Sequence, residues 1–383
     1  MSDYQTELDR LVGELNRGAT ARPTSAPTQQ RNPTAITPLL EKAVKDSASD
    51  ILLVAGSPAC LRIHGRLKTT QGTTPLSDDD IRAMVLPLMN PTDYTTLQKE
   101  RSVDLAFSSP TGHRFRLNVH YQRGTLAASI RLLPKDVPTL AQLNLPETVA
   151  SFVNLRQGLV LLTGPTGSGK TSTLAAIVDA INRTRECHVV TIEEPVEYEH
   201  RNRLSVIEQI EVGRDTPSFL NSLRSILRQS PDVILVGEMR DSETISTALT
   251  ASETGHLVLS TLHTNDTSQA ISRILDSFPS ANQSQIRQQF SLALAAIVAQ
   301  QLVPSADGNR RYPACEILTG VDAIRNLIRH GQDHQIRSQL IMSRAAGMCT
   351  MEQSLADLYH NARITRDTAL SHSFRPDDLR DIL

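Results

Sequence analysis

The sequence predicts an α/β protein of two domains, in which a large domain with a parallel sheet follows a smaller α+β domain. Three observations support this prediction. The chain has 383 residues, more than a single hydrophobic core usually organises. In its second half, short continuous apolar runs alternate with helical patterns, as they do around a buried parallel sheet. A glycine-rich motif, GPTGSGKT, stands between one such run and one such helical pattern.

The first 37 residues are expected to form a disordered tail. Leu8, Leu11, Val12 and Leu15 fall at helical spacing, but the stripe is too short to be stable alone. The stretch that follows, up to about Pro38, is rich in Ala, Thr, Pro and Gln, a composition typical of a linker. We expect the short helix to fray. The alternative is that the helix docks on a partner.

Residues 38–134 are expected to form the smaller domain. The capping sequence SDDD opens a helical pattern at Ser77. Two alternating segments predict paired strands joined by a turn at Arg123 and Gly124. The expected helices are 41–49 and 77–89, and the expected strands are 51–54, 60–63, 114–119 and 126–132.

A second linker, residues 135–143, is expected to lead into the larger domain, residues 144–383. Its apolar runs are continuous and rich in β-branched residues, which favours strands buried on both faces. These runs are 159–163, 188–192, 233–236 and 257–261. After about Asp266 the pattern becomes helical, which predicts a C-terminal helical region.

Composition excludes several classes of function. A formal net charge of −2, aromatic residues at 3% and the absence of Trp argue against nucleic acid as a partner. The four cysteines lack paired spacing, so we expect reduced thiols and no zinc motif. No apolar stretch approaches the roughly 18 to 20 residues of a membrane span, and the N-terminus lacks signal-peptide features. A cytoplasmic location is therefore expected.

The segment 164–171 is expected to bind nucleotide phosphates, since it matches GxxxxGK[ST] in full. Glycines let successive N–H groups face phosphate oxygens, and the following helix adds its positive end. Lys170 should reach the β and γ phosphates, and the Thr171 hydroxyl should ligate Mg²⁺. A glycine-rich turn without a ligand is the alternative. The expected cradle comprises Gly164, Pro165, Thr166, Gly167, Ser168, Gly169, Lys170 and Thr171.

Acidic residues follow two of the apolar runs. Glu193, Glu194 and Glu197 come at the end of the run 188–192, and Glu238 comes one residue after Gly237. Ligands of an open parallel sheet gather at the carboxyl ends of its strands, so these acids should face the phosphate loop. We expect Glu238 to support Mg²⁺ or its water shell. A solvent-exposed acidic turn is the alternative for the first group.

His263 follows the run 257–261 and could donate to the γ-phosphate. A lone histidine is more often structural, so a role for His263 at the phosphate depends on the motifs around it.

In this order the motifs resemble those of the ATPases of type II and type IV secretion and of pili, and within that superfamily its pilus retraction branch. GPTGSGKT resembles the Walker A box, TIEEPVEYEH the Asp box, DVILVGEMRD the atypical Walker B element and TGHLVLSTLHTND the His box. The resemblance covers roughly residues 39–365. It implies a RecA-like ATPase domain that uses ATP and Mg²⁺, and a homohexameric ring that drives type IV pilus retraction and twitching motility.

The resemblance also implies roles for single residues. Glu197 would be the general base, Glu238 would support Mg²⁺, and His263 would sense the γ-phosphate. The family usually has Asp where this chain has Glu194.

The N-terminal domain resembles the family's PAS-like domain through SDILLVAGSPACLRIHG and RFRLNVHYQRGTLAASIR. In the family, arginines of this domain approach the nucleotide phosphates, and the matching positions are Arg116 and Arg131. Taken without the resemblance, two arginines on paired strands are usually solvated.

The segment AIRNLIR, residues 323–329, matches a motif of the retraction motors in full. It predicts a helix with Ile324, Leu327 and Ile328 on one face and with Arg325 and Arg329 turned toward a partner. The partner that the resemblance implies is an inner-membrane platform protein, and membrane association would come through it alone. The alternatives are an assembly or secretion ATPase and a non-hydrolysing accessory subunit of the ring.

Overall fold

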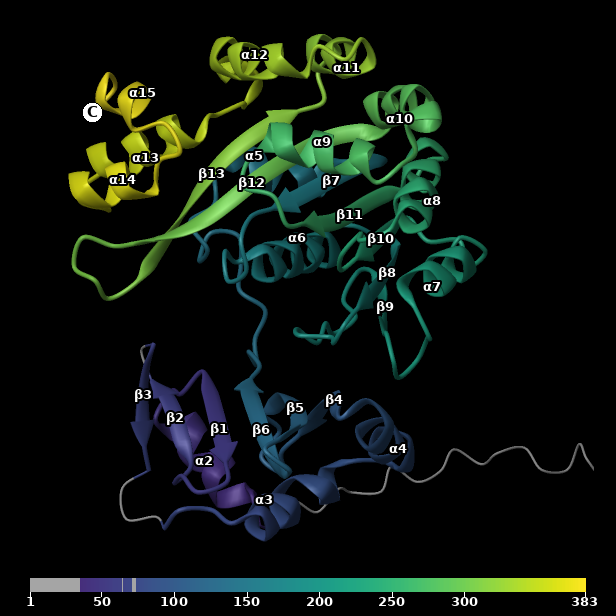
Figure 1. Ribbon diagram of the computed structural model, residues 1–383. Coiled ribbons are helices and arrows are strands. Elements are labelled where there is room, and N and C mark those ends of the chain that lie inside the picture. The colour runs from purple at the N-terminus through teal and green to yellow at the C-terminus, as the bar shows by residue number, and fades with distance from the viewer. Residues whose placement is uncertain (1–34, 64, 71–73) are drawn as a thin grey trace, which may run out of the picture. The chain divides into compact units, whose positions relative to one another are not determined.

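The computed structural model describes residues 35–63, 65–70 and 74–383. It divides into two compact units that meet between Leu132 and Leu133, and each has a sheet of its own (Figure 1). The helical stripe expected at Leu8 to Leu15 lies outside the described residues. No helix of the described residues is long and apolar enough to cross a membrane.

The N-terminal unit is built on a six-stranded antiparallel sheet. Its strands are β1 (Asp50–Val54), β2 (Cys60–Ile63), β3 (Arg66–Thr69), β4 (Ser102–Ser108), β5 (Arg114–Gln122) and β6 (Thr125–Leu132), in the order β3-β2-β1-β6-β5-β4. Along β5, buried Phe115, Leu117 and Val119 alternate with more exposed polar residues. The buried face packs in one core with helices α2 (Thr37–Lys45), α3 (Asp78–Val85) and α4 (Pro91–Glu100). The opposite face carries mostly polar side chains, together with the apolar side chains of Leu52, Val54 and Leu67.

Several N-terminal elements differ from the expectation. The first helix begins at Thr37, because Pro38 is tolerated in a first turn, where its missing N–H has no partner to lose. It ends at Lys45, just before Ser47 adopts a positive φ of 51°. The expected capping box at Ser77 and the turn at Arg123 and Gly124 are confirmed. The elements β3, α4 and β4 have no counterpart in the expectation.

The larger unit contains a seven-stranded sheet in the order β13-β12-β7-β11-β10-β8-β9. The four expected apolar runs are β7 (Gly158–Thr163), β8 (His188–Glu193), β10 (Val233–Val236) and β11 (Leu257–Leu262). They pair in parallel, and β7, β10 and β11 are buried along their whole length. The parallel edge strand β9 (Val206–Glu211) was not expected.

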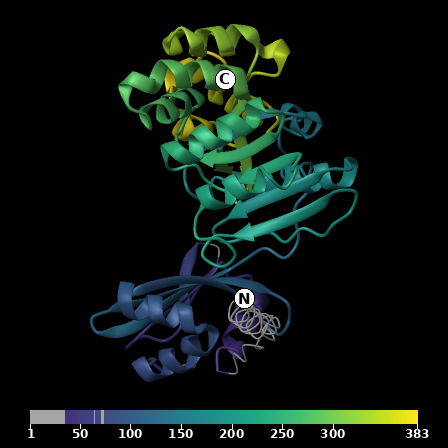
Figure 2. The ribbon, with the colours of Figure 1, turned by 90° about the vertical axis from the view of Figure 1, so that its right-hand side faces the viewer.

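Helices cover both faces of this sheet (Figures 1 and 2). The flanking helices are α5 (Glu147–Ser151), α6 (Lys170–Thr184), α7 (Phe219–Ile226), α8 (Ser242–Glu253), α9 (Thr267–Asp276), α10 (Ser280–Ala293), α11 (Asp322–Arg329) and α12 (Ile336–Met342). Leu159 and Leu161 of β7 enter one core with α7 to α12, whereas Val160 and Leu162 enter a second core with α5 and α6. The alternation along β7 therefore fixes a three-layer arrangement.

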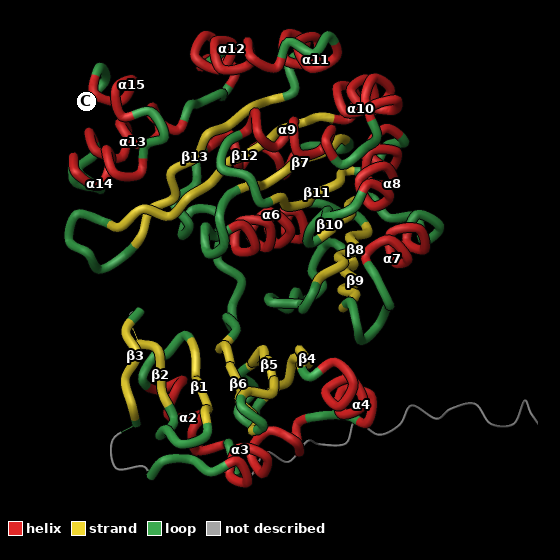
Figure 3. Tube along the Cα trace, viewed as in Figure 1, coloured by secondary structure: helices red, strands yellow, loops and turns green. Residues whose placement is uncertain are grey.

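The expected helical pattern after Asp266 is found from α9 onward, but it is wrong for residues 294–319. Two long strands, β12 (Leu294–Pro304) and β13 (Arg311–Thr319), form an antiparallel hairpin, and β12 also pairs with β7 (Figure 3). The Ala-rich run of β12 suits a helix by propensity, but burial between two strands overrides that preference. The Asp307-Gly308 turn was the local signal for the hairpin. Helices α13 (Met351–His360), α14 (Arg366–His372) and α15 (Pro376–Arg380) pack on residues of this hairpin.

Candidate functional site

The phosphate loop connects β7 to the N-terminus of α6. Gly164 and Gly169 adopt φ angles of 145° and 90°, which side-chain-bearing residues rarely adopt. A Cβ atom at Gly164 would lie 2.2 Å from the backbone oxygen of Gln300. Glycine is therefore required where the loop passes closest to β12.

Lys170, the first residue of α6, is buried and points back into the loop. Its Nζ donates to the backbone oxygens of Gly164 at 2.8 Å and of Pro165 at 3.1 Å. Burial lowers the pKa of Lys170, and the negative charge of Glu238 opposes that shift. The Oγ of Ser168 is also buried and has no hydrogen-bond partner among the described residues. A curled backbone with a lysine and an unpaired hydroxyl fits an anionic phosphate chain.

Glu238 lies two residues beyond β10 and is the centre of a charged cluster. Arg240 Nη2 lies 2.8 Å from one of its carboxylate oxygens, and His263 Nε2 lies 3.6 Å from the other. Burial raises the pKa of Glu238, but the hydrogen bond from Arg240 and the charges of Arg240, His263 and Lys170 outweigh it, so the pKa lies below its ordinary value. The structure thus brings Lys170, Glu238 and His263 together.

Hydrogen bonds between strand ends hold this cluster in place. The Thr261 hydroxyl of β11 donates to the Gly237 oxygen at 2.6 Å, which ties the end of β10 to the strand that precedes His263. Thr163, the last residue of β7, donates to the Thr264 oxygen at 2.7 Å and accepts from the Thr264 N–H at 2.8 Å. The phosphate loop, Glu238 and His263 are therefore anchored to one rigid edge of the sheet.

The three acids after β8 differ in their surroundings. Glu193 accepts hydrogen bonds from Thr191 at 2.7 Å and from Gln209 at 3.2 Å, and burial raises its pKa, so its part is structural. Glu194 is exposed, with an oxygen 4.0 Å from Arg240 Nη1. Glu197 is half-buried.

Tyr198 ties the segment that carries Glu197 to the phosphate-binding helix. Its hydroxyl lies 2.8 Å from Ser172 Oγ, and the tyrosine ring is buried. Thr171 is the residue before Ser172, and Glu197 is the residue before Tyr198. The Ser172–Tyr198 contact therefore brings the backbone at Thr171 and the backbone at Glu197 close together.

Arg116 and Arg131 lie directly opposite each other on β5 and β6 in the N-terminal unit. A row of charges, the arginine row, crosses four strands on the face opposite the core, in the order Arg62, Asp50, Arg131 and Arg116. Arg131 Nε lies 2.9 Å from Asp50, and Arg116 Nη2 lies 3.5 Å from Asp104. Both arginines are accessible to a ligand, since Arg131 is 61% and Arg116 is 38% exposed along the side chain.

Helix α11 is held to the larger unit by both of its faces. Ile324 and Ile328 are fully buried, and Leu327 packs against the same core. Arg325 donates to the backbone oxygens of Gly320 at 2.6 Å and of Leu294 at 3.1 Å. The expectation that Arg325 faces a partner is therefore wrong, whereas Arg329 is exposed.

Sequence reasoning missed two residues at the site. Arg240 is paired with Glu238. The one sequence feature that could have identified Arg240 is its position two residues after that acid. Gln300 contacts the phosphate loop from β12, a strand that the sequence did not reveal.

Magnesium would take few ligands from the protein. Within the described residues, no group of three or more His, Cys, Asp or Glu side chains is arranged to hold a metal ion. Mg²⁺ at a nucleotide keeps several waters and binds phosphate oxygens, so one hydroxyl and one carboxylate suffice. Thr171 and Glu238 fit that description.

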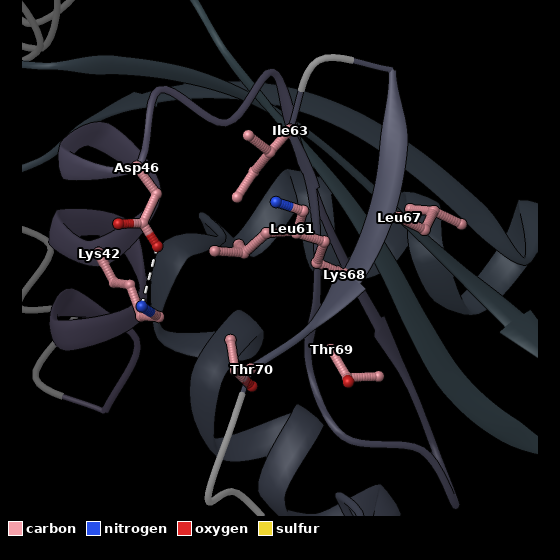
Figure 4. A pocket seen from close by; sticks show the side chains of 8 residues that line it. All are labelled: Lys42, Asp46, Leu61, Ile63, Leu67, Lys68, Thr69 and Thr70. Carbon is pink, nitrogen blue, oxygen red and sulfur yellow. Dashed lines mark hydrogen bonds and ion pairs between the residues drawn. The ribbon is translucent and has the colours of Figure 1, made fainter.

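A cavity of about 730 Å³ opens elsewhere, beside α2, β2 and β3 of the N-terminal unit (Figure 4). Of its two lysines, Lys42 is already paired with Asp46 at 2.8 Å. None of the residues expected at the nucleotide site lines the cavity, and it lacks a glycine-rich loop. The cavity therefore lacks the features that make the phosphate loop fit a nucleotide.

Comparisons with known proteins agree with this geometry. The chain is 39% identical over 343 residues to the type IV pilus retraction ATPase PilT of Pseudomonas aeruginosa, covering 90% of this chain and 99% of the relative. It is 38% identical over 342 residues to the type IV pilus ATPase PilU of the same organism, covering 89% of each. A crystal structure of the pilus retraction motor PilT with bound ADP superposes with a TM-score of 0.83 at 42% identity, covering 90% of this chain and 99% of that one. Residues 29–367 match a family model described as type II/IV secretion system protein, and the chain belongs to that family.

Proposed function

We propose that this chain is a motor ATPase that hydrolyses ATP to retract type IV pili. It works as a homohexameric ring at the cytoplasmic face of the inner membrane and acts on the platform protein of the pilus. Its membrane association comes through that partner, and it binds no nucleic acid.

The observation that carries the proposal is the single cluster formed by the phosphate loop, Glu238 and His263. Lys170 would exchange the two backbone oxygens that it now contacts for phosphate oxygens. His263, 45% exposed along its side chain, has room to reach a terminal phosphate while it stays close to Glu238. Bound Mg²⁺ would neutralise phosphate charge, with Thr171 and Glu238 as its protein contacts.

The remaining roles concern the attacking water and the charge that develops on the phosphate. Glu197 would orient the water and accept its proton. Arg116 and Arg131 would stabilise the transition-state charge, because both side chains are accessible and each is held by an ion pair with an aspartate.

A second candidate function is that of a partner ATPase within a retraction machine. This candidate is supported by the nearly equal similarity of the chain to PilT, which is named a retraction ATPase, and to PilU, which is named only a type IV pilus ATPase. In that case another motor would retract the pili together with this chain.

Deleting the gene tests the proposal. Surface pili should accumulate while twitching stops, and the wild-type gene should restore both properties whereas a Lys170→Ala gene should not. Reduced piliation would instead indicate an assembly motor. Retraction that persists at reduced force would favour the second candidate.

A further inference from the structure

Gln300 of β12 lies against the phosphate loop, with both ends of its side-chain amide in use. Its Nε2 donates to the backbone oxygen of Ser168 at 2.7 Å, and its Oε1 accepts from the Thr173 hydroxyl at 3.0 Å. The side chain is buried, with 3% of the residue exposed. One residue thus joins the loop to the first turn of α6.

The orientation of this amide follows from its partners. A backbone oxygen can only accept, so the amino group of Gln300 must face Ser168. The other end then presents its oxygen to Thr173, whose hydroxyl can donate. Reversing the amide would place two oxygens against each other.

We propose that Gln300 is a positioning residue for nucleotide binding, a role that rests on the nucleotide site proposed above. A trans peptide is planar, so its C=O and N–H groups point in opposite directions. By holding the Ser168 oxygen toward β12, Gln300 turns the Gly169 N–H away from β12 and into the concave side of the loop. That N–H is one of the donors that a phosphate needs.

The packing around the glycines supports this role. A Cβ atom at Gly169 would lie 2.9 Å from Gln300 Nε2, and the backbone oxygen of Gln300 excludes a side chain at Gly164. Strand β12 is fixed beside β7 by the pairing of Ala299 with Thr163. The strand therefore supports the loop at its beginning and at its end.

Without the amide, the Ser168 oxygen would be a buried acceptor lacking a partner, which is costly. The Ser168-Gly169 peptide could recover a partner by rotating, and rotation would carry the Gly169 N–H away from the phosphates. The expected consequence is weaker nucleotide binding rather than global unfolding.

Gln300→Met tests the proposal, because methionine keeps the length of the side chain and removes both hydrogen bonds. In the purified full chain, calorimetry should show Mg-ADP bound roughly 10-fold or more weakly than by wild type. Gln301→Met is the matched control. The neighbouring amide donates to the His372 oxygen at 2.9 Å, away from the loop, so Mg-ADP affinity should stay within about twofold of wild type.

Gln300→Glu adds a readout that a purely structural role would not change. A neutral carboxyl can donate to the Ser168 oxygen, whereas a carboxylate cannot and also repels phosphate. The Mg-ADP affinity of this variant, divided by that of wild type, should therefore fall as pH rises and recover as pH is lowered. Thr173→Val, which removes only the second bond, serves if the Gln300→Met variant fails to fold, and it should also weaken Mg-ADP binding.

The possible failures can be told apart. Wild-type protein that does not bind Mg-ADP would overturn the proposed nucleotide site itself. Wild-type protein that binds, together with folded Gln300→Met that binds equally well, would overturn only the role of Gln300. A lower melting temperature with unchanged Mg-ADP affinity would likewise assign Gln300 a structural part alone.

Discussion

The phosphate loop and the arginine row hold their charged groups in different ways. Lys170 is buried, and its ammonium group is satisfied by two backbone oxygens of the loop that it serves. Arg116 and Arg131 stand on the more exposed face of a sheet, where Arg116 pairs with the exposed Asp104 and Arg131 pairs with Asp50, whose side chain is 16% exposed. The comparison shows that the fold positions the Lys170 ammonium group before any ligand binds. Arg116 and Arg131 can leave their aspartate partners at a small cost in free energy when a more strongly charged ligand binds nearby.

Lys170→Ala should give the largest effect, the loss of both Mg-ADP binding and phosphate release. The phosphate charge would lose the cation that compensates it, because Lys170 is the buried lysine of the phosphate loop. Calorimetry and a phosphate-release assay measure the two losses, and Lys135→Ala, at an exposed lysine, is the control. Turnover at the wild-type rate would refute the site.

Glu197→Gln should separate chemistry from binding within the larger unit. The amide is nearly isosteric but cannot accept the proton of water, so hydrolysis should fall by roughly 10²-fold or more while Mg-ADP affinity is kept. Glu199→Gln, at an exposed acid two residues away, is the control. If Glu238→Gln stops turnover and Glu197→Gln does not, the two acids have exchanged roles.

Leu327→Ala extends the comparison to α11, which is far from the loop in sequence. Leu327 is only partly buried, so the cavity should lower the free energy of unfolding by about 2 kcal/mol, the lower end of the usual range. ATP binding and part of the hydrolysis should survive, while pilus retraction in a deletion strain should not be restored.

The matched control for α11 is Asn326→Ala, at an exposed position of the same helix. Normal retraction by Leu327→Ala would make the motif match incidental. Loss of ATP binding by the folded variant would make α11 part of the nucleotide site.

Arg131→Ala and Arg116→Ala should each have the smallest effect on stability, less than about 1 kcal/mol in the free energy of unfolding. Asp50, the partner of Arg131, keeps Arg62 at 3.5 Å, so no carboxylate is left buried and unpaired. Urea unfolding measures the change. A loss of several kcal/mol would show that the row is structural.

The sequence predicted what is encoded locally. The glycines and Lys170 stand within one contiguous motif, and the strands before Glu238 and His263 are continuous apolar runs. Whether these residues act as proposed depends on a ligand, so their roles remain predictions.

What the sequence did not reveal depends on distant partners. Gln300 reaches the loop from a strand whose Ala-rich run suits a helix until β7 and β13 enclose it. Arg325 was expected to face a partner, but the backbone oxygens of Gly320 and Leu294 capture its guanidinium group. A helical wheel shows which face a residue occupies but not which carbonyl groups the rest of the fold brings to it.

The central claim is that the larger unit binds the nucleotide and the arginine row acts only in turnover. The most direct test measures Mg-ADP affinity and the phosphate-release rate of the purified Arg116→Ala/Arg131→Ala double variant. The account predicts an affinity within about twofold of wild type and a rate lower by a factor of roughly 10³ or more, the range over which arginines act in other nucleotide hydrolases. An unchanged rate, or an affinity that falls as far as the rate does, would contradict it.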